Sequence, residues 1–177
     1  MKLLNFPAFK QTFKYDCGAK VTEAILDYYG IDMLESEIMK LEGTNCKRGT
    51  DIEGVLHVLK QHGLDYTYEK MSIEKVRQFI DLGVPVIMIV QAWTTRKKVD
   101  WETDWSDGHY VIAIGYDNEK LYFEDPYIIL RTFLTFSELK ERWHYANGPE
   151  RQRHFNMGIA VFGPQNAYTP KKAIHMD

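Results

Sequence analysis

A chain of 177 residues with 45% hydrophobic and 14% aromatic side chains is apolar enough to bury a core, which excludes an intrinsically disordered chain. The formal net charge of −3 gives no general attraction to nucleic acid or to anionic lipid. No apolar run reaches the ~18 residues that span a bilayer, and Asn5 and Pro7 interrupt the N-terminus before a secretory signal can form, so we expect a cytoplasmic protein without membrane insertion.

The first half of the chain predicts helices. Apolar residues recur there at helical spacing, and glycines end three of the segments. Thr50 and Glu53 are spaced as a capping box at the start of the third segment. The predicted helices cover residues 18–29, 35–41, 50–62 and 73–82.

After residue 84 the pattern is typical of strands. Runs of β-branched and aromatic residues predict strands at 84–90, 109–116, 121–124 and 157–162. Asp117–Glu119 is a turn sequence that joins the second and third of them as a hairpin. Ser137 is a candidate cap for a helix over 138–144. Helices followed by an antiparallel sheet indicate an α+β fold.

The chain has no repeat and no internal linker, so we expect one domain over residues 1–163. Residues 164–177 hold two prolines and few apolar side chains, which predicts a loosely held C-terminal tail.

Cys17 is the most informative residue. It stands directly before a predicted helix, where the helix dipole and unpaired N–H groups favour the nucleophilic thiolate over the thiol. Gly18 beside it permits close approach of backbone and substrate. Cys46 lies in a segment without these features, so Cys17 is the predicted reactive thiol. A disulfide between the two is the less favoured alternative in the absence of a secretory signal.

His109 and Asp125 are the candidate partners of this thiol. His109 begins one predicted strand, and Asp125 ends the next strand of the same hairpin. An antiparallel hairpin brings such positions together, so that the acid can orient the imidazole and the imidazole can act as base. Taken singly, each residue is more often structural, as a small buried cysteine, a packed histidine or an Asp-Pro turn. Their joint arrangement favours catalysis.

Three sequence blocks extend this pattern. The first consists of Gln11 and Tyr15–Gly18, the second is 107–117 with the sequence DGHYVIAIGYD, and the third is 123–126 with the sequence FEDP. In this order they resemble the C39-like branch of papain-like cysteine peptidases, and weaker matches extend the resemblance from about residue 8 to 140. The resemblance implies a papain-like fold, with a helical layer carrying Cys17 packed on an antiparallel sheet that carries His109 and Asp125.

The resemblance also implies roles. Cys17 corresponds to the nucleophile, His109 to the base, Asp125 to the orienting acid and Gln11 to an oxyanion-hole donor, which would act with the Cys17 N–H. The substrate is then a peptide or a small amide. Family members that trim leader peptides at paired glycines are fused to membrane and ATP-hydrolysing parts. Neither part is visible here, so the sequence does not favour a double-glycine substrate.

Two other features complete the predictions. No cofactor or metal site is expected, because the histidines and the acidic residues 100–107 lack a ligand spacing. Residues 93–106 contain three tryptophans and precede the His109 strand, and they are a candidate mobile flap; a packed surface loop is the alternative.

The sequence therefore predicts a cysteine peptidase. An acyltransferase or transpeptidase on the same Cys-His-Asp site is the first alternative, and a non-catalytic binding module on the same fold is the second. Nothing in the sequence indicates an oligomeric state.

Overall fold

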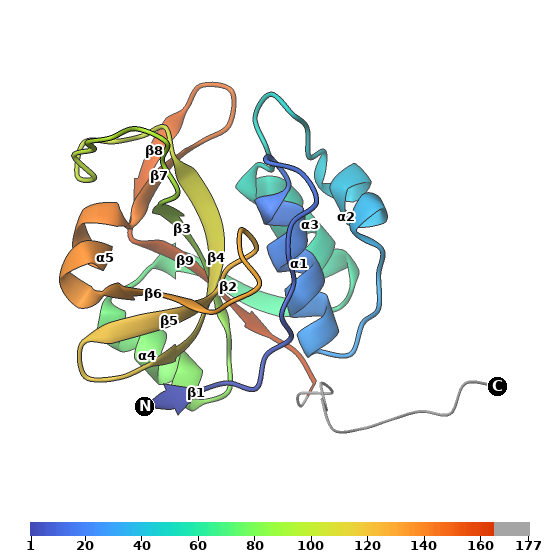
Figure 1. Ribbon diagram of the computed structural model, residues 1–177. Helices are drawn as coiled ribbons and strands as arrows, with labels where there is room; N and C mark the ends of the chain where they lie inside the picture. Colours follow the sequence, from blue (N-terminus) through green and yellow to red (C-terminus); the bar gives the residue numbers. More distant parts are fainter. Residues whose placement is uncertain (165–177) are drawn as a thin grey trace.

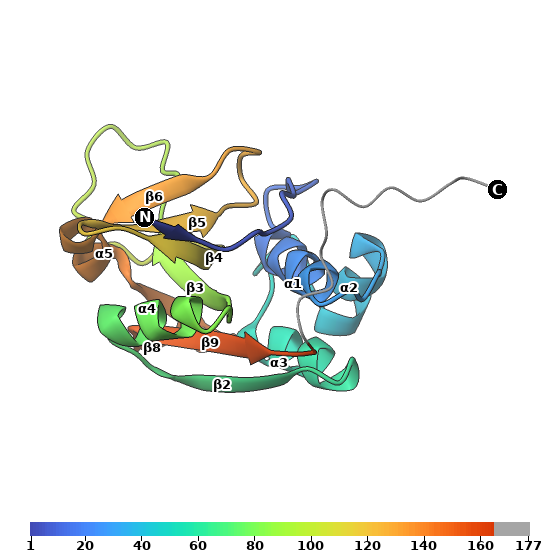
Figure 2. The same ribbon diagram turned by 90° about the horizontal axis from the view of Figure 1, so that it is seen from below.

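The computed structural model describes residues 1–164 as a helical layer beside a sheet (Figures 1 and 2). The helices are α1 (Cys17–Tyr28), α2 (Glu35–Glu42), α3 (Ile52–Gln61), α4 (Ile73–Asp81) and α5 (Phe136–Arg142). The strands are β1 (Lys2–Leu3), β2 (Asp65–Lys70), β3 (Val86–Gln91), β4 (Gly108–Tyr116), β5 (Lys120–Glu124), β6 (Thr132–Thr135), β7 (His144–Asn147), β8 (Gln152–Phe155) and β9 (Met157–Phe162).

The main sheet is antiparallel throughout. Its order is β2-β9-β3-β4-β5-β6, with β1 paired to β4, while β7 and β8 form a separate hairpin. The central strand β3 is buried along its whole length, as expected for a strand covered on both faces. Helices α1–α3 lie on one side of the sheet, and α4 and α5 lie beside its strands elsewhere (Figure 2). The predicted α+β layout is confirmed.

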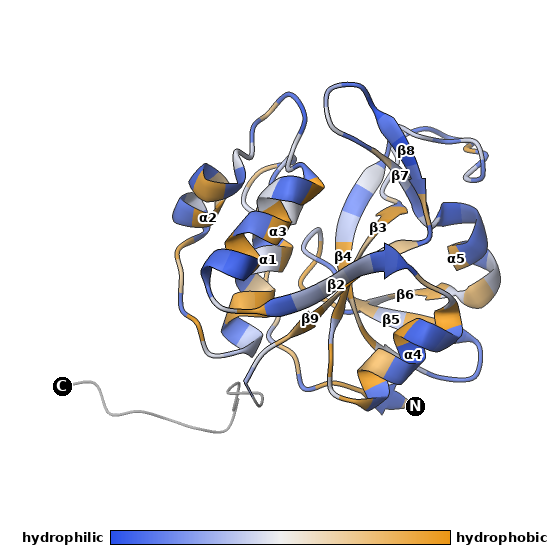
Figure 3. Ribbon diagram, turned by 180° about the vertical axis from the view of Figure 1, so that it is seen from behind, coloured by the Kyte–Doolittle hydropathy of each residue, from blue (hydrophilic) through white to orange (hydrophobic). Residues whose placement is uncertain are grey.

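The helices are amphipathic, as their spacing predicts. In Figure 3 hydrophobic and hydrophilic residues alternate along the turns of helices such as α2 and α4. On α4 the buried residues are Val76, Phe79 and Ile80, which lie three and four positions apart on one face. The four helices of the first half and the four predicted strands are all present, with ends shifted by one or two residues.

Two predicted caps are wrong. The helix near residue 137 begins earlier, because Thr135 and Glu138 form a complete capping box in place of Ser137. Helix α3 has no capping box, since its N-cap Asp51 makes no side-chain cap bond. Its first N–H group, of Ile52, instead donates to Asn147 Oδ1 at 3.0 Å. Asn147 is 95 residues away in the sequence, so no local pattern predicts it.

Five further strands lie outside the segments that the sequence pattern predicts: β1, β2, β6, β7 and β8. All are short or lie at an edge of the sheets, where the apolar pattern is weak. β1 pairs with β4, and at Gly115, opposite Leu3, a Cβ atom would stand 2.6 Å from the Lys2 carbonyl oxygen. From this pairing the N-terminal segment runs toward the start of α1 (Figure 1).

The extent of the domain, residues 1–163, stays a prediction. The predicted tail, 164–177, lies outside the described residues except for its first position. None of the helices within residues 1–164 has the length and apolar character needed to cross a bilayer.

Candidate active site

Strands β4 and β5 bring His109 and Asp125 together. Ile112 pairs with Glu124, so Asp125 at the end of β5 lies diagonally across from His109 near the start of β4. His109 Nε2 and Asp125 Oδ1 are 2.7 Å apart, and both residues are buried. The hairpin juxtaposition predicted from the sequence is present.

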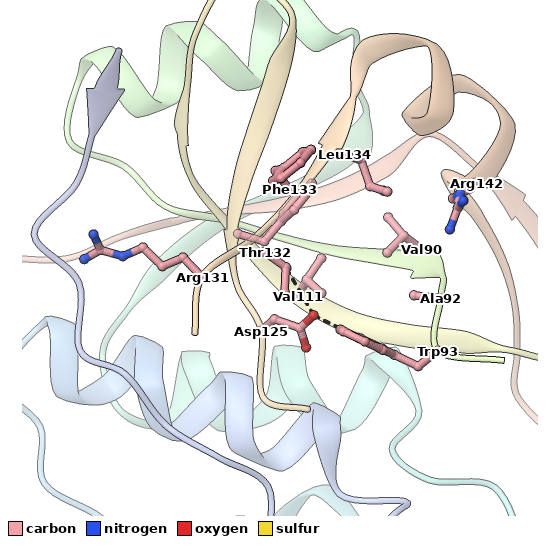
Figure 4. A pocket seen from close by; sticks show the side chains of 11 residues that line it. Val90, Ala92, Trp93, Val111, Asp125, Arg131, Thr132, Phe133, Leu134 and Arg142 are labelled. Carbon is pink, nitrogen blue, oxygen red and sulfur yellow. Dashed lines mark hydrogen bonds between the residues drawn. The ribbon is translucent and has the colours of Figure 1, made fainter. Parts of the chain in front are cut away.

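Four donors converge on the Asp125 carboxylate. Oδ1 accepts from His109 Nε2 and from the Tyr127 N–H at 2.9 Å, while Oδ2 accepts from Trp93 Nε1 at 3.0 Å and Thr132 Oγ1 at 3.1 Å. Figure 4 shows the Trp93 and Thr132 bonds. Burial alone would raise the pKa of Asp125, but His109 and these donors outweigh burial and lower it. An ionised Asp125 can only accept, so the proton stands on Nε2 of His109 and leaves Nδ1 for another partner.

Cys17 is the candidate for that place. It is the first residue of α1, it is half-buried, and its sulfur is close enough to His109 to raise the pKa of the imidazole. Burial opposes a charged imidazole, but Asp125 and Cys17 together raise the pKa of His109 to about 9. With this pKa the imidazole is an imidazolium at neutral pH, bonded to the Asp125 carboxylate.

The start of α1 lacks a side-chain cap. Asp16, the N-cap residue, is fully buried but turns its carboxylate back to the preceding loop, where Oδ2 accepts from the Thr12 N–H at 3.1 Å and the Phe13 N–H at 2.8 Å. The backbone N–H groups of the first helical turn are thus not covered by the Asp16 side chain. Such groups beside a nucleophile are suited to stabilise an oxyanion.

Gln11 lies on this same loop. Its backbone N–H donates to the Pro126 carbonyl at 2.8 Å, which ties the loop to the residue that follows Asp125. Its side-chain amide donates to the Phe13 carbonyl at 2.6 Å, while its Oε1 is buried without a partner among the described residues. In this structure the amide therefore points within its own loop, and its role as an oxyanion donor stays a prediction.

Gly18 serves packing. A Cβ atom at this position would lie 2.4 Å from the Thr50 side chain, so α1 can approach the segment before α3 only through glycine. The sequence predicts close approach of backbone and substrate at Gly18, whereas the close neighbour in the structure is Thr50.

Trp93 contacts Asp125, although no sequence pattern predicts a role for it at the site. Its ring stacks on Tyr127, with centroids 4.4 Å apart, and its indole N–H holds Asp125. Trp93 itself has a positive φ of 58°, an uncommon conformation outside glycine. Tyr127 in turn presents its ring to His109 edge-on at 6.3 Å. The two aromatic side chains thus border the Asp–His pair.

Trp93 belongs to the segment that was predicted as a flap. The segment is closed at its base by a bond from the Ala92 N–H to the Asp107 carbonyl, and Arg96 joins Asp104 and Asp107 through ion pairs of 2.7 and 2.6 Å. These contacts hold the two ends of the loop together and tie Arg96 to its C-terminal part. Its mobility stays a prediction.

An apolar cavity of about 390 Å³ adjoins Asp125 on strands β3–β6 (Figure 4). Trp93 and Asp125 line it, whereas Cys17 and His109 do not. Among residues 1–164 no three His, Cys, Asp or Glu side chains are grouped as ligands of a metal ion would be. The buried His144, for example, pairs its Nε2 with the Asp104 carbonyl at 2.6 Å.

Comparisons with known proteins give one consistent result. The model of the Peptidase_C39 like family matches residues 3–149. The peptidase domain of ComA from Streptococcus is 21% identical, with a TM-score of 0.66 over 93% of this chain and 100% of that one. A C39-like peptidase from Bacillus anthracis is 17% identical, with a TM-score of 0.69 over 93% and 98% of the two chains.

A third structure is a double glycine motif protease from an AMS/PCAT transporter, solved with its leader peptide. It is 16% identical, with a TM-score of 0.66 over 90% of this chain and 92% of that one. A search of the curated proteins finds no match. At these identities the structural likeness concerns the fold, and the predicted papain-like α+β fold is confirmed.

Proposed function

Since the chain belongs to the Peptidase_C39 like family, as its motifs indicate, we propose that it is a cysteine peptidase that cleaves a peptide bond through an acyl-enzyme on Cys17. The observation that carries the proposal is the buried His109, which is held at 2.7 Å by the Asp125 carboxylate and has its pKa raised by both Asp125 and Cys17. Nucleophile, base and orienting acid in this order are the parts that acyl transfer needs.

In the first step the Cys17 thiolate attacks the carbonyl carbon of the scissile bond. The carbonyl oxygen becomes an oxyanion beside the uncapped start of α1, where the Cys17 N–H and the Gln11 amide would stabilise it. For this the Gln11 amide must leave the Phe13 carbonyl. The His109 imidazolium gives its Nδ1 proton to the departing amine, and a thioester on Cys17 remains.

In the second step the neutral His109 takes a proton from water, whose oxygen attacks the thioester carbonyl. The C–S bond breaks, the acid product leaves, and Cys17 returns as thiolate beside imidazolium. Asp125 stays ionised throughout and keeps the proton on Nε2, so that Nδ1 always faces the reacting groups.

The proposal includes a peptide as substrate, by analogy with the leader peptide bound to the AMS/PCAT protease. It includes a cytoplasmic location as well, because both cysteines are free and free thiols persist in reducing compartments. An acyltransferase would differ only in the acceptor of the second step, where an amine takes the place of water.

The test is intact-mass analysis of the protein after rapid acid quenching in the presence of a peptide mixture. We expect an acyl adduct on Cys17 that Cys17→Ala abolishes and that Cys46→Ser still forms. Addition of a primary amine separates the two chemistries, since a transferase yields amide products and a peptidase yields free acids. The absence of any adduct and any cleavage would favour the binding module.

A further inference from the structure

A second, polar cleft of about 260 Å³ contains Cys17 in its wall. Its sheet side comes from β3, β4 and the β7–β8 hairpin, and its helix side from residues 14–17 and 46–51. The loop between α2 and α3 and the β7–β8 hairpin project from the same end of the molecule in Figures 1 and 3. The volume is below the roughly 300–1,000 Å³ of sites for drug-sized ligands, so it suits one or two residues of a peptide.

The two sides of this cleft are held at a fixed spacing. Asn147 at the tip of β7 bonds the Ile52 N–H through its Oδ1, and its amide nitrogen donates to the Glu53 carboxylate at 3.0 Å. Tyr110 on β4 donates from its hydroxyl to the Thr50 carbonyl at 3.1 Å. These bonds join the sheet to the helical layer beside the nucleophile, so the cleft is formed before a substrate enters.

The charged residues of the cleft are mostly positive. Lys14, Lys47 and Arg48 line it, and all three are exposed. Asp51 is the one acidic residue of the lining, and its carboxylate is already paired with Arg48 at 3.0 Å. Within residues 1–164, neither lysine has a carboxylate at ion-pair distance. The cleft therefore carries an excess of two positive charges in a chain whose formal net charge is −3.

We propose that this cleft binds an acidic side chain, Asp or Glu, within two residues of the bond that Cys17 attacks. The inference rests on the proposed function and adds the substrate class to it: peptides with a carboxylate next to the scissile bond. Lys14 and Lys47 are the specificity-determining residues, because their charges are unpaired and face the same small space. Exposed charge pairs are individually weak, so the two together favour Glu over the isosteric Gln by roughly 3–30-fold at low salt.

The experiment profiles cleavage of a mixture of proteome-derived peptides by mass spectrometry. Wild-type protein should cut bonds that have Asp or Glu enriched at one position within two residues. The double variant Lys14→Met/Lys47→Met should lose that enrichment. Lys60→Met is the matched control, because Lys60 is an exposed lysine at the end of α3 outside the cleft. Enrichment should also fall in 0.5 M salt.

A second measurement does not depend on peptide cleavage. Iodoacetate and neutral iodoacetamide alkylate the same Cys17 thiolate with loss of iodide, and the ratio of their rates reports the local charge. We expect this ratio to fall by roughly 3–30-fold in the double variant and to stay unchanged in Lys60→Met.

Two outcomes would overturn this inference and leave the proposed function intact. One is cleavage without an acidic preference, and the other is a preference and an alkylation ratio that are unchanged in the double variant. No cleavage of any peptide overturns both.

Discussion

Asp125→Asn tests the arrangement of the site most directly. The pKa of His109 stands at about 9, against 6.5 for an ordinary histidine. Because one pH unit corresponds to about 1.4 kcal/mol, the two partners stabilise the imidazolium by roughly 3 kcal/mol beyond the cost of burial. If Asp125 supplies about half of this stabilisation, replacing its charge with the neutral Asn amide removes about 1–2 kcal/mol of it.

The sign of the pH effect follows from the raised pKa. The His109 imidazolium persists below its pKa and is lost as the pH rises through it. We therefore expect the alkaline limb of kcat/KM near pH 9 to move down by about one unit in Asp125→Asn. The charged His109 also stabilises the fold. This contribution is complete below pH 6.5 and is lost as the pH rises through about 9, so the pH dependence of the unfolding free energy should be weaker in Asp125→Asn.

The effect of Asp125→Asn on kcat at the pH optimum should be larger than the shift of the alkaline limb alone implies. Asn presents one acceptor oxygen where the carboxylate presents two, so its NH₂ group must face either His109 and Tyr127 or Trp93 and Thr132. We expect kcat to fall at least about 10-fold and the free energy of unfolding to fall by about 1–3 kcal/mol.

The assay is a pH profile of peptide cleavage, combined with urea denaturation. Asp65→Asn is the control, because Asp65 is exposed on β2 and its carboxylate makes no hydrogen bond or ion pair within residues 1–164. An alkaline limb that stays in place, with turnover within twofold of wild type, would refute the role of Asp125.

Three further predictions concern single side chains. Trp93→Phe keeps an aromatic ring on Tyr127 but loses the bond to Asp125, so kcat/KM should fall about 3–10-fold, while Trp101→Phe in the same loop should have no effect. Burial raises the pKa of Glu42 to about 7 against an ordinary 4.5, so ionisation costs folded stability as the pH rises. In urea denaturation the free energy of unfolding of the wild type should therefore fall by roughly 2–3 kcal/mol between pH 5 and pH 8, and this fall should be absent in Glu42→Gln. Asp16→Ala frees two loop N–H groups and should lower kcat about 10-fold with unchanged helical circular dichroism.

The sequence alone determined the parts of the site that are local. A cysteine before a helix and a histidine and an aspartate on one hairpin are short-range patterns, because helix periodicity and hairpin turns fix which residues face one another within a few turns of chain. For this reason the α+β layout and the His109–Asp125 pair were both predictable, whereas the family resemblance was needed to place Cys17 beside them.

The tertiary structure decided everything that depends on distant segments meeting. Trp93 reaches Asp125 across 32 residues, and Asn147 caps α3 across 95. The positive cleft likewise unites residues 14–17, 46–51 and 145–147. No periodicity encodes these meetings, since they follow from how loops close over a packed sheet. The sequence determined the residues available for chemistry, and the packing of the two layers decided which charges and donors surround Cys17.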